Sequence, residues 1–425
     1  MSRRPAHHFE DGLRHLEEYE HTFEVYAKRR WLGKQLISVL CTEFVAIGRE
    51  YFEDAVRTGK IRINGEKVEA TRVFRDNDHL THTTIVHEPP VLAEPPTVIA
   101  ERDDCLVVNK PPSIPIHPGG AYRHNTLIHM LAEMRDESAQ LSPLHRIDRL
   151  TSGIVVLAKT TAFAQLFFRA MEAKLIRKVY LARVDGRFDA SSEAMLAREG
   201  VSASDVADER WRVASLSEVM AEPRGAASKA AASLHRRISV EGAMFCTNHK
   251  DGVWDFSPTS DGVAAADEGT GCKRPRQEGK HSRTDFQCIG YHAESHTSLL
   301  LCFPHTGRTH QIRVHLKHLG QPVCDDPCYN PSFTIGQGQH TKAYHHRLIP
   351  HVVLEAPDGE GEGDGQGHGC KRARKCEEGS GASSAGGGKA FHASGICLHA
   401  FQYEKEGEGG FCFRAPLPQW TSDFI

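Results

Sequence analysis

Three separated segments carry polar and charged side chains that are not typical packing material. Residues 145–153 (HRIDRLTSG) place Asp148 between two arginines, directly before an apolar run. Tyr180 lies in a second segment, and residues 306–316 (TGRTHQIRVHL) form the third, between core-like flanks. A buried carboxylate needs a cationic partner to stay ionised, and a guanidinium provides it as a fork of donors. The pattern predicts a site built on an ionised Asp148 that is paired with an arginine.

Hydrophobic periodicity indicates the elements that must position these segments. The run from Ile154 to Ala158 is continuously apolar, which predicts a buried strand directly after Asp148. Residues 178–184 alternate, which predicts a strand that carries Tyr180. Other predicted elements are a strand over residues 105–109 and helices over residues 126–148 and 161–175.

The first 90 residues have a different pattern from the rest of the chain. We expect a tail over residues 1–19 and a small α/β module over 20–90, with a helical pattern over 33–56 and a hairpin in GKIRINGEKV. Asn64-Gly65 is a strong turn signal between alternating apolar residues. A Pro-rich linker follows, and we predict a second domain over residues 95–425.

Two insertions interrupt the second domain, at about residues 189–278 and 355–389. Both are rich in small and charged residues, which bury little apolar surface. We expect ordered structure in the first insertion near residues 236–245 and a disordered loop for the second. Each insertion holds a short basic tetrad, at 273–276 and 371–374. These tetrads are interpreted either as nuclear-import signals or as solubilising charge.

Composition restricts the class of protein only partly. The formal net charge is −3, although nucleic-acid-binding proteins are usually basic, but acidic residues of the second insertion would mask a basic groove in this total. Twelve cysteines without regular spacing indicate a reducing compartment rather than a disulfide framework. We find no apolar signal stretch and no run long enough to span a membrane. We expect a cytoplasmic or nuclear protein and leave a mitochondrial location open.

The first chemical segment and four later blocks resemble one known family. HRIDRLTSG resembles the HRLDRxTSG signature of the RluA-type RNA pseudouridine synthases. The family blocks KVYLARVDG, GKHSRTDF, HTGRTHQIRVHLKHLGQPVCDDPCY and LHAFQYEKEGEGGFCFRAPLP follow in order, covering most of residues 95–425 outside the insertions. The resemblance implies an α+β fold with a large mixed, mostly antiparallel sheet and a central RNA cleft. Residues 20–90 resemble an S4-type RNA-binding domain, and the N-terminal segment resembles the eukaryotic branch that modifies a tRNA anticodon-loop uridine.

The resemblance also implies roles for individual residues. Asp148 matches the essential aspartate, which either attacks the sugar or pyrimidine or removes a proton from the sugar. Arg313 matches the arginine that pairs with this aspartate through a forked hydrogen bond, and Tyr180 matches the active-site tyrosine whose ring faces the uracil. Arg146 matches a side chain that fills the gap left by the flipped nucleotide. The RNA-binding residues that we expect are Arg146, Arg149, Arg308 and His310.

Three other interpretations are weighed beside this one. Asp148 could be a structural aspartate that caps the turn before the buried strand. The histidines His305, His310 and His315 could hold a metal for hydrolysis, but five-residue steps in a strand would point successive histidines to opposite faces, and Cys324 and Cys328 lack the second ligand pair of a zinc site. The chain could also be an inactive RNA-binding or RNA-chaperone protein. We expect an enzyme without metal or cofactor that acts as a monomer on RNA, in the first place tRNA with rRNA as an alternative, and not at a membrane.

Overall fold

The computed structural model describes residues 4–44, 47–135, 141–205, 236–248, 252–258, 279–333, 341–344 and 391–424. These residues form two compact units. The smaller unit is centred on residues 16–89, and the larger contains residues 8–15 with most of the described chain from residue 90 onward. Each unit has a hydrophobic core of its own.

The smaller unit packs two helices against a four-stranded sheet of order β3-β6-β4-β5. Its elements are β3 (Tyr19–Tyr26), η1 (Arg29–Trp31), α1 (Leu36–Glu43), α2 (Arg49–Arg57), β4 (Ile61–Ile63), β5 (Glu66–Lys67) and β6 (His79–Val86). Each helix buries one face, with apolar residues three to five positions apart, and these faces meet in one core. The predicted helical pattern over residues 33–56 is therefore a pair of helices, the second of which begins after the extended Gly48.

The predicted hairpin is confirmed in the smaller unit. β4 and β5 pair antiparallel across Asn64 and Gly65, whose φ angles are 55° and 79°. Both angles lie in the left-handed region that a two-residue turn of this kind requires, and asparagine and glycine tolerate that region best. The Asn64 side chain also accepts a hydrogen bond from the backbone N–H of His79 at 2.8 Å, which fixes the turn against β6.

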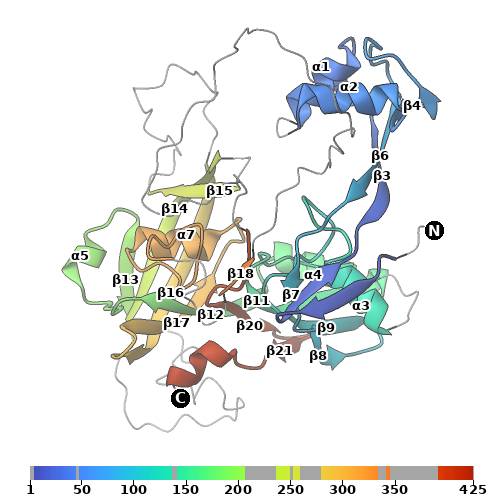
Figure 1. Cartoon of the computed structure of the whole chain (residues 1–425). Helices are drawn as coiled ribbons and strands as arrows, with labels where there is room; N and C mark the ends of the chain where they lie inside the picture. The colour runs from blue at the N-terminus through green and yellow to red at the C-terminus, as the bar shows by residue number, and fades with distance from the viewer. Residues whose placement is uncertain are drawn as a thin grey trace. The chain divides into compact units, whose positions relative to one another are not determined.

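The larger unit is built on a 12-stranded sheet (Figure 1). Its main path runs β13-β14-β16-β17-β12-β20-β11-β9-β8, and β10, β15 and β21 pair with β11, β14 and β20. The strands are β8 (Thr97–Glu101), β9 (Cys105–Lys110), β10 (Ser142–Pro143), β11 (Ser152–Ala158), β12 (Ile176–Asp185), β13 (Val201–Asp205), β14 (Arg236–Asn248), β15 (Val253–Ser257), β16 (Lys280–His292), β17 (Thr297–Pro304), β20 (Leu398–Lys405) and β21 (Phe411–Arg414). β11 and β20 run parallel, whereas the other pairings of this sheet are antiparallel. The predicted mixed, mostly antiparallel sheet is confirmed.

Short helices and small sheets complete the described chain. They are β1 (His7–Glu10), β2 (Leu13–Leu16), β7 (Val91–Leu92), α3 (Leu127–Arg135), α4 (Thr161–Glu172), α5 (Glu193–Leu196), α7 (Gln311–His318), β18 (Thr341–Tyr344), β19 (Phe391–Ser394) and η3 (Gln419–Phe424). α7 packs on β15, β16 and β17, and buries six consecutive residues, from Gln311 to Leu316. None of the helices in the described ranges is long and apolar enough to cross a membrane.

The prediction of a tail over residues 1–19 is wrong for residues 7–16. These residues form β1 and β2, which join β7 in a three-stranded sheet. Arg14 explains why the segment is held: its guanidinium is buried and donates to the side chain of Asn125 at 2.6 Å and to Glu133 at 2.8 Å. A paired, buried arginine anchors a segment that apolar periodicity alone does not reveal.

The predicted helix over residues 126–148 is also wrong from residue 141 onward. Ser142 and Pro143 form β10, which pairs with the end of β11. Proline lacks the backbone N–H of a helix and clashes with the preceding turn, so the helical pattern could not continue through Pro143. Asp148 therefore lies in the loop between β10 and β11.

The described strands of the first insertion belong to the large sheet. β13, β14 and β15 extend it beyond β16, which confirms the expected order near residues 236–245. The second insertion, and the basic tetrads of both, lie outside the described residues.

Gly153 lets two strands of the site approach each other closely. Its φ is +111°, and a Cβ at this position would lie 2.3 Å from the carbonyl oxygen of Ala400 on β20. β11 and β20 pair in parallel at this point. Only glycine permits both the backbone angle and the contact. The close pairing places the end of the Asp148 loop directly beside β20, the neighbour of β12.

Candidate active site

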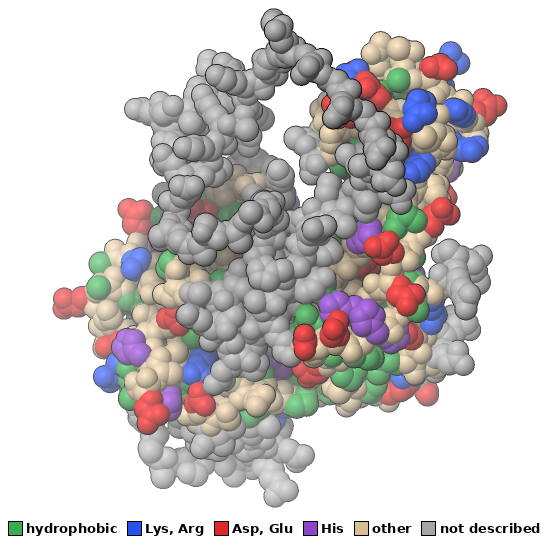
Figure 2. Space-filling model, viewed as in Figure 1, with side chains coloured by type: hydrophobic (Ala, Val, Ile, Leu, Met, Phe, Trp, Pro, Cys, Tyr) green, Lys and Arg blue, Asp and Glu red, His purple; other side chains and the backbone are tan. Residues whose placement is uncertain are grey.

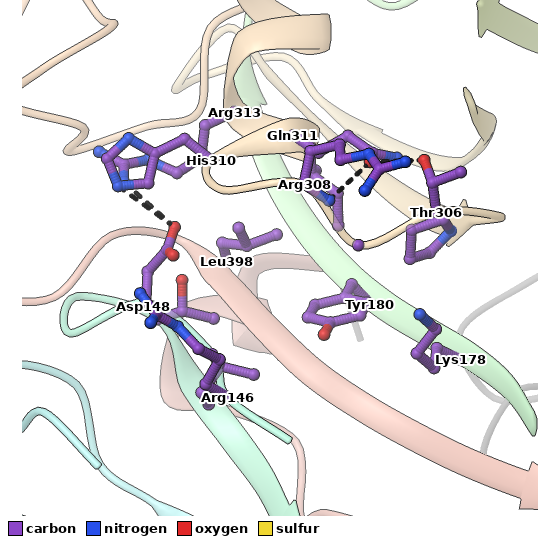
Figure 3. A pocket seen from close by; sticks show the side chains of 15 residues that line it. Arg146, Asp148, Lys178, Tyr180, Thr306, Arg308, His310, Gln311, Arg313 and Leu398 are labelled. Atoms are coloured by element: carbon purple, nitrogen blue, oxygen red, sulfur yellow. Dashed lines mark hydrogen bonds and ion pairs between the residues drawn. The ribbon is translucent and has the colours of Figure 1, made fainter. Parts of the chain in front are cut away.

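One cavity of about 510 Å³ collects residues from all three chemical segments (Figure 3). Six of the seven predicted site residues line it: Arg146, Asp148, Tyr180, Arg308, His310 and Arg313. The remaining lining residues are Ile147, Thr151, Lys178, Pro304, Thr306, Gly307, Gln311, Ile312 and Leu398. Segments far apart in the sequence therefore meet where the loop before β11, the first half of β12 and the start of α7 converge.

Asp148 and Arg313 are in direct contact within this cavity. Arg313 Nη1 donates to Asp148 Oδ2 at 3.2 Å, across 165 positions of sequence. Asp148 keeps 22% of its side chain exposed, whereas Arg313 keeps 3%. The carboxylate thus faces the cavity, while its cationic partner is supplied from the protein interior.

The predicted fork between Arg313 and Asp148 is wrong, because the fork binds Asp326 instead. Arg313 Nε and Nη2 donate to the two carboxylate oxygens of Asp326 at 2.7 and 2.8 Å, and Asp326 is fully buried. Burial by itself would lower the pKa of Arg313, but the hydrogen bonds and charge of Asp326, with a contribution from Asp148, raise it. Asp326 therefore orients the guanidinium and leaves Nη1 for Asp148.

Lys110 fixes the backbone of the Asp148 loop. Its fully buried Nζ donates to the carbonyl oxygens of Pro111 and Ile114, both at 2.8 Å, and of Arg149 at 3.2 Å. The last contact ties the residue that follows Asp148 to the end of β9. Burial lowers the pKa of Lys110.

Tyr180 is held by a second tyrosine. Its hydroxyl lies 2.8 Å from the hydroxyl of Tyr403 on β20, whose ring in turn stacks on His145 with centroids 4.5 Å apart. Burial raises the pKa of Tyr180 to about 12 and lowers the pKa of His145 to about 3. At neutral pH, Tyr180 is therefore a neutral phenol, and His145, which contacts Tyr403, is a neutral imidazole.

His310 and Arg146 flank Asp148 on different sides. His310 has a φ of 58° at the start of α7; its Nδ1 lies 2.8 Å from the Tyr329 hydroxyl and its Nε2 lies 3.8 Å from Asp148 Oδ2. Burial lowers the pKa of His310, although the charge of Asp148 opposes the shift. Arg146 is exposed at the cavity and makes no hydrogen bond or ion pair with the described parts of the chain, so its side chain is available to a ligand.

The other two predicted RNA-binding arginines differ. Arg308 lines the cavity and donates from Nε to the carbonyl oxygen of His281 at 2.9 Å. Arg149 lies outside the cavity lining: its guanidinium lies over the Tyr122 ring at 5.5 Å, with a weak contact to the Ser113 carbonyl oxygen at 3.5 Å. These contacts favour a structural role for Arg149.

The sequence predicts that the histidines of the third segment lie on a strand, and this prediction is wrong. His310 is the residue directly before α7, at its N-cap, and His315 lies in the middle of the helix. His315 is buried against Ser282 Oγ at 3.0 Å, and His305 bonds Asp285 at 2.7 Å. No group of three potential metal ligands occurs within the ranges that the structure describes.

The sequence analysis assigns no role to three residues that the structure places at the site, Asp326, Tyr403 and Lys178. Asp326 stands in CDDPC, where only the two cysteines suggest a ligand role. Lys178 lies two positions before Tyr180, and the two-residue period of a strand puts both on one face. Tyr403 gave no local signal, because its role depends on the antiparallel pairing of β12 with β20.

Comparison with known proteins decides the family. A sequence profile described as RNA pseudouridylate synthase matches residues 104–318, about half of the chain. This chain belongs to the RluA-type RNA pseudouridine synthases. The predicted family and its α+β fold are confirmed, and the S4-like assignment of residues 20–90 stays a prediction.

Several members of the RNA pseudouridine synthase family are similar over most of the chain. Pseudouridylate synthase RPUSD2 of Mus musculus is 34% identical, over 82% of this chain and 52% of its own length. RNA pseudouridine synthase 7 of Arabidopsis thaliana is 31% identical, over 77% of this chain and 69% of its own length. The mitochondrial tRNA pseudouridine(32) synthase of Saccharomyces cerevisiae is 32% identical, over 75% and 56%. The match thus spans about half of the mouse and yeast proteins.

Proposed function

We propose that the chain converts a uridine of RNA to pseudouridine, with Asp148 as the catalytic carboxylate. The proposal depends above all on the 3.2 Å contact between Arg313 Nη1 and Asp148 Oδ2, within a cavity that Tyr180 and Arg146 also line. Membership of the RNA pseudouridine synthase family supports the same activity.

The reaction needs a carboxylate and involves no net oxidation or reduction. The N1–C1′ bond of uridine breaks, the uracil turns, and C5 bonds to C1′; N1 gains a proton and C5 loses one. Asp148 either bonds covalently to the sugar or pyrimidine or removes a proton from the sugar. Its Oδ2 accepts from Arg313, whereas Oδ1 accepts no hydrogen bond from the described residues and is the oxygen that we assign to the chemistry.

We propose that the ring of Tyr180 contacts the uracil and that its hydroxyl lies close to C5, which loses a proton in the reaction. Because burial raises the pKa of Tyr180 to about 12, the hydroxyl is neutral and acts through hydrogen bonds rather than as a phenolate. Tyr403 holds that hydroxyl at 2.8 Å and fixes the ring beside the cavity. Tyr403 is therefore a positioning residue.

Removal of the Tyr403 hydroxyl is expected to slow the reaction without weakening RNA binding. We expect Tyr403→Phe to lower kcat about tenfold with KM nearly unchanged, since one hydrogen bond to the Tyr180 hydroxyl is lost. In a Tyr180→Phe background, the same change should have almost no further effect. Carbodiimide primer extension on timed samples measures the rates. If Tyr403→Phe slowed both backgrounds equally, it would not act through Tyr180.

The substrate that we propose is tRNA. A relative of 32% identity is a tRNA pseudouridine(32) synthase, and the exposed Arg146 is suited to enter the base stack when a loop uridine is extruded. To test the activity, the full chain is incubated with unmodified tRNA transcripts and every pseudouridine is mapped. We expect one modified loop uridine in a subset of tRNAs; absence of pseudouridine from tRNA and from total RNA would contradict the proposal.

The smaller unit is proposed to add affinity as an S4-like RNA-binding module. Its helix pair and hairpin have their own core, and Lys and Arg side chains gather on the part that carries α1, α2 and β4 (Figure 2). Arg49 and Arg57 are 66% and 75% exposed in this region, and each also pairs with a carboxylate of the same helix, Glu53 and Asp54 respectively. Exposed cations of this kind bind phosphates without reading sequence.

Substitution of Arg49 and Arg57 by glutamine tests the module. We expect the double variant to bind tRNA about five- to tenfold more weakly at moderate salt and to convert saturating tRNA at an unchanged rate. A matched control is Arg102→Gln in the larger unit, which we expect to bind as the unaltered chain does. Equal tRNA affinities for the double variant and the unaltered chain would contradict a binding role for this surface.

A further inference from the structure

A second cavity, of about 700 Å³, shares Lys178 and Pro304 with the catalytic cavity. The lining residues that matter for binding are Lys174, Arg177, Lys178, Arg237, Asp285 and Phe303. Four of them are lysine or arginine, and Asp285 is the single carboxylate among them. Two cavities that share lining residues, one of them basic, suit a polyanion that passes from one to the other.

Lys178 is the cation that the two cavities share. It lies on the same face of β12 as Tyr180 (Figure 3), and its ammonium has no hydrogen bond or ion pair with the portion of the chain that is described. Burial lowers the pKa of Lys178. Withdrawal of an ammonium from water without an anion is unfavourable, so the position favours an anionic ligand that arrives from outside.

The acidic group of the second cavity is already engaged. Asp285 accepts from Ser239 Oγ at 2.6 Å and lies 2.7 Å from His305 Nε2. These partners outweigh burial and lower the pKa of Asp285 to about 2. The carboxylate is therefore satisfied without Lys178, and Lys174 lies at the exposed edge of the same cavity.

Arg237 and Phe303 form a flat surface in the second cavity. The guanidinium of Arg237 lies 4.1 Å from the centre of the Phe303 ring and donates to the side-chain oxygen of Gln287. Bases of single-stranded RNA stack on aromatic rings and on guanidinium planes of this kind.

We propose that the second cavity binds the nucleotide next to the target uridine. Lys178 binds the phosphate that joins the two nucleotides, the neighbouring base stacks on Arg237, and Lys174 contacts the next phosphate. The proposal rests on RNA being the substrate, but it concerns binding and not turnover. It predicts that the protein prefers an oligonucleotide to a mononucleotide because of this cavity.

Binding of a labelled 12-residue oligouridylate to the full chain tests the second cavity. We expect Arg237→Gln and Lys174→Gln each to weaken binding about fivefold near 0.1 M salt. We also expect Lys174→Gln to flatten the salt dependence by roughly 0.7 in the logarithmic slope, the share of one phosphate of a single strand. The matched control is Arg187→Gln, because Arg187 follows the opposite end of β12 and lines neither cavity. Two variants are used so that a folding defect in one, checked by thermal unfolding, leaves the other informative.

Binding of uridine 5′-monophosphate separates a neighbouring-nucleotide site from a mononucleotide site. We expect its affinity to be the same in the unaltered chain and in both cavity variants. The proposal is overturned if Arg237→Gln and Lys174→Gln bind the oligouridylate like Arg187→Gln, or if they lose the mononucleotide and the oligouridylate by the same factor. Because neither measurement requires turnover, an inactive but binding-competent protein would contradict the proposed activity and leave the second cavity supported.

Discussion

Asp148→Asn protein is expected to form no measurable pseudouridine, a loss of roughly 10⁴-fold or more, and to bind the same RNA within about twofold. Asparagine has nearly the size of aspartate but neither attacks carbon nor accepts a proton as a base. The side chain is partly exposed to the cavity and is not needed to fill the core. Carbodiimide primer extension measures the product, and filter binding measures the affinity.

The same variant separates an enzyme from an inactive RNA-binding protein. An RNA chaperone with an inactive catalytic fold would remodel RNA equally well with and without the Asp148→Asn substitution, and neither protein would form pseudouridine. A structural Asp148 would instead show itself as a loss of thermal stability in Asp148→Asn. We expect unfolding within about 1 kcal/mol of the unaltered chain, because the Arg313 fork to Asp326 stays intact.

Arg313→Met is expected to cost both activity and stability. It leaves Asp326, a fully buried carboxylate, without its cationic partner. Removal of one partner of a buried ion pair lowers the free energy of unfolding by about 3–5 kcal/mol. It also removes the donor to Asp148, so pseudouridine formation should fall by at least about 100-fold. Chemical denaturation measures the first effect, and single-turnover kinetics measures the second.

A second substitution separates the two roles of Arg313. In Arg313→Met/Asp326→Asn, the buried negative charge is absent, so part of the lost stability should return. Activity should not return, because Asp148 still lacks its donor. If the double variant regained both stability and pseudouridine formation, Arg313 would be structural only, and its contact with Asp148 would not matter to the reaction.

Local signals were sufficient for the parts of the site that lie within one element. The apolar run after Asp148 predicts β11, and the alternation around Tyr180 predicts β12, because a buried strand and a half-buried strand leave distinct patterns. Resemblance to the family then paired Asp148 with Arg313. The structure brings the two into contact at 3.2 Å.

Residues that act through tertiary pairing could not be predicted in the same way. The family resemblance assigns the forked hydrogen bond of Arg313 to Asp148, but the fork binds Asp326. Residue type does not show which of two carboxylates meets two donors, because the geometry of the fold decides it. Tyr403 reaches Tyr180 only through the pairing of β12 with β20. The sequence predicts a strand for the third segment, whereas the structure has a short helix, α7, with six consecutive buried residues.

Release of tritium from RNA that carries [5-³H]uridine, measured in the presence of a metal chelator, tests the central claim most directly. Loss of the C5 hydrogen accompanies each uridine that is isomerised, and the claim is that Asp148, held by Arg313, brings this about. We predict tritium release equal to pseudouridine formed for the unaltered chain, and none for Asp148→Asn. Equal release by both proteins, or none by the unaltered chain on RNA that it binds, would contradict the account.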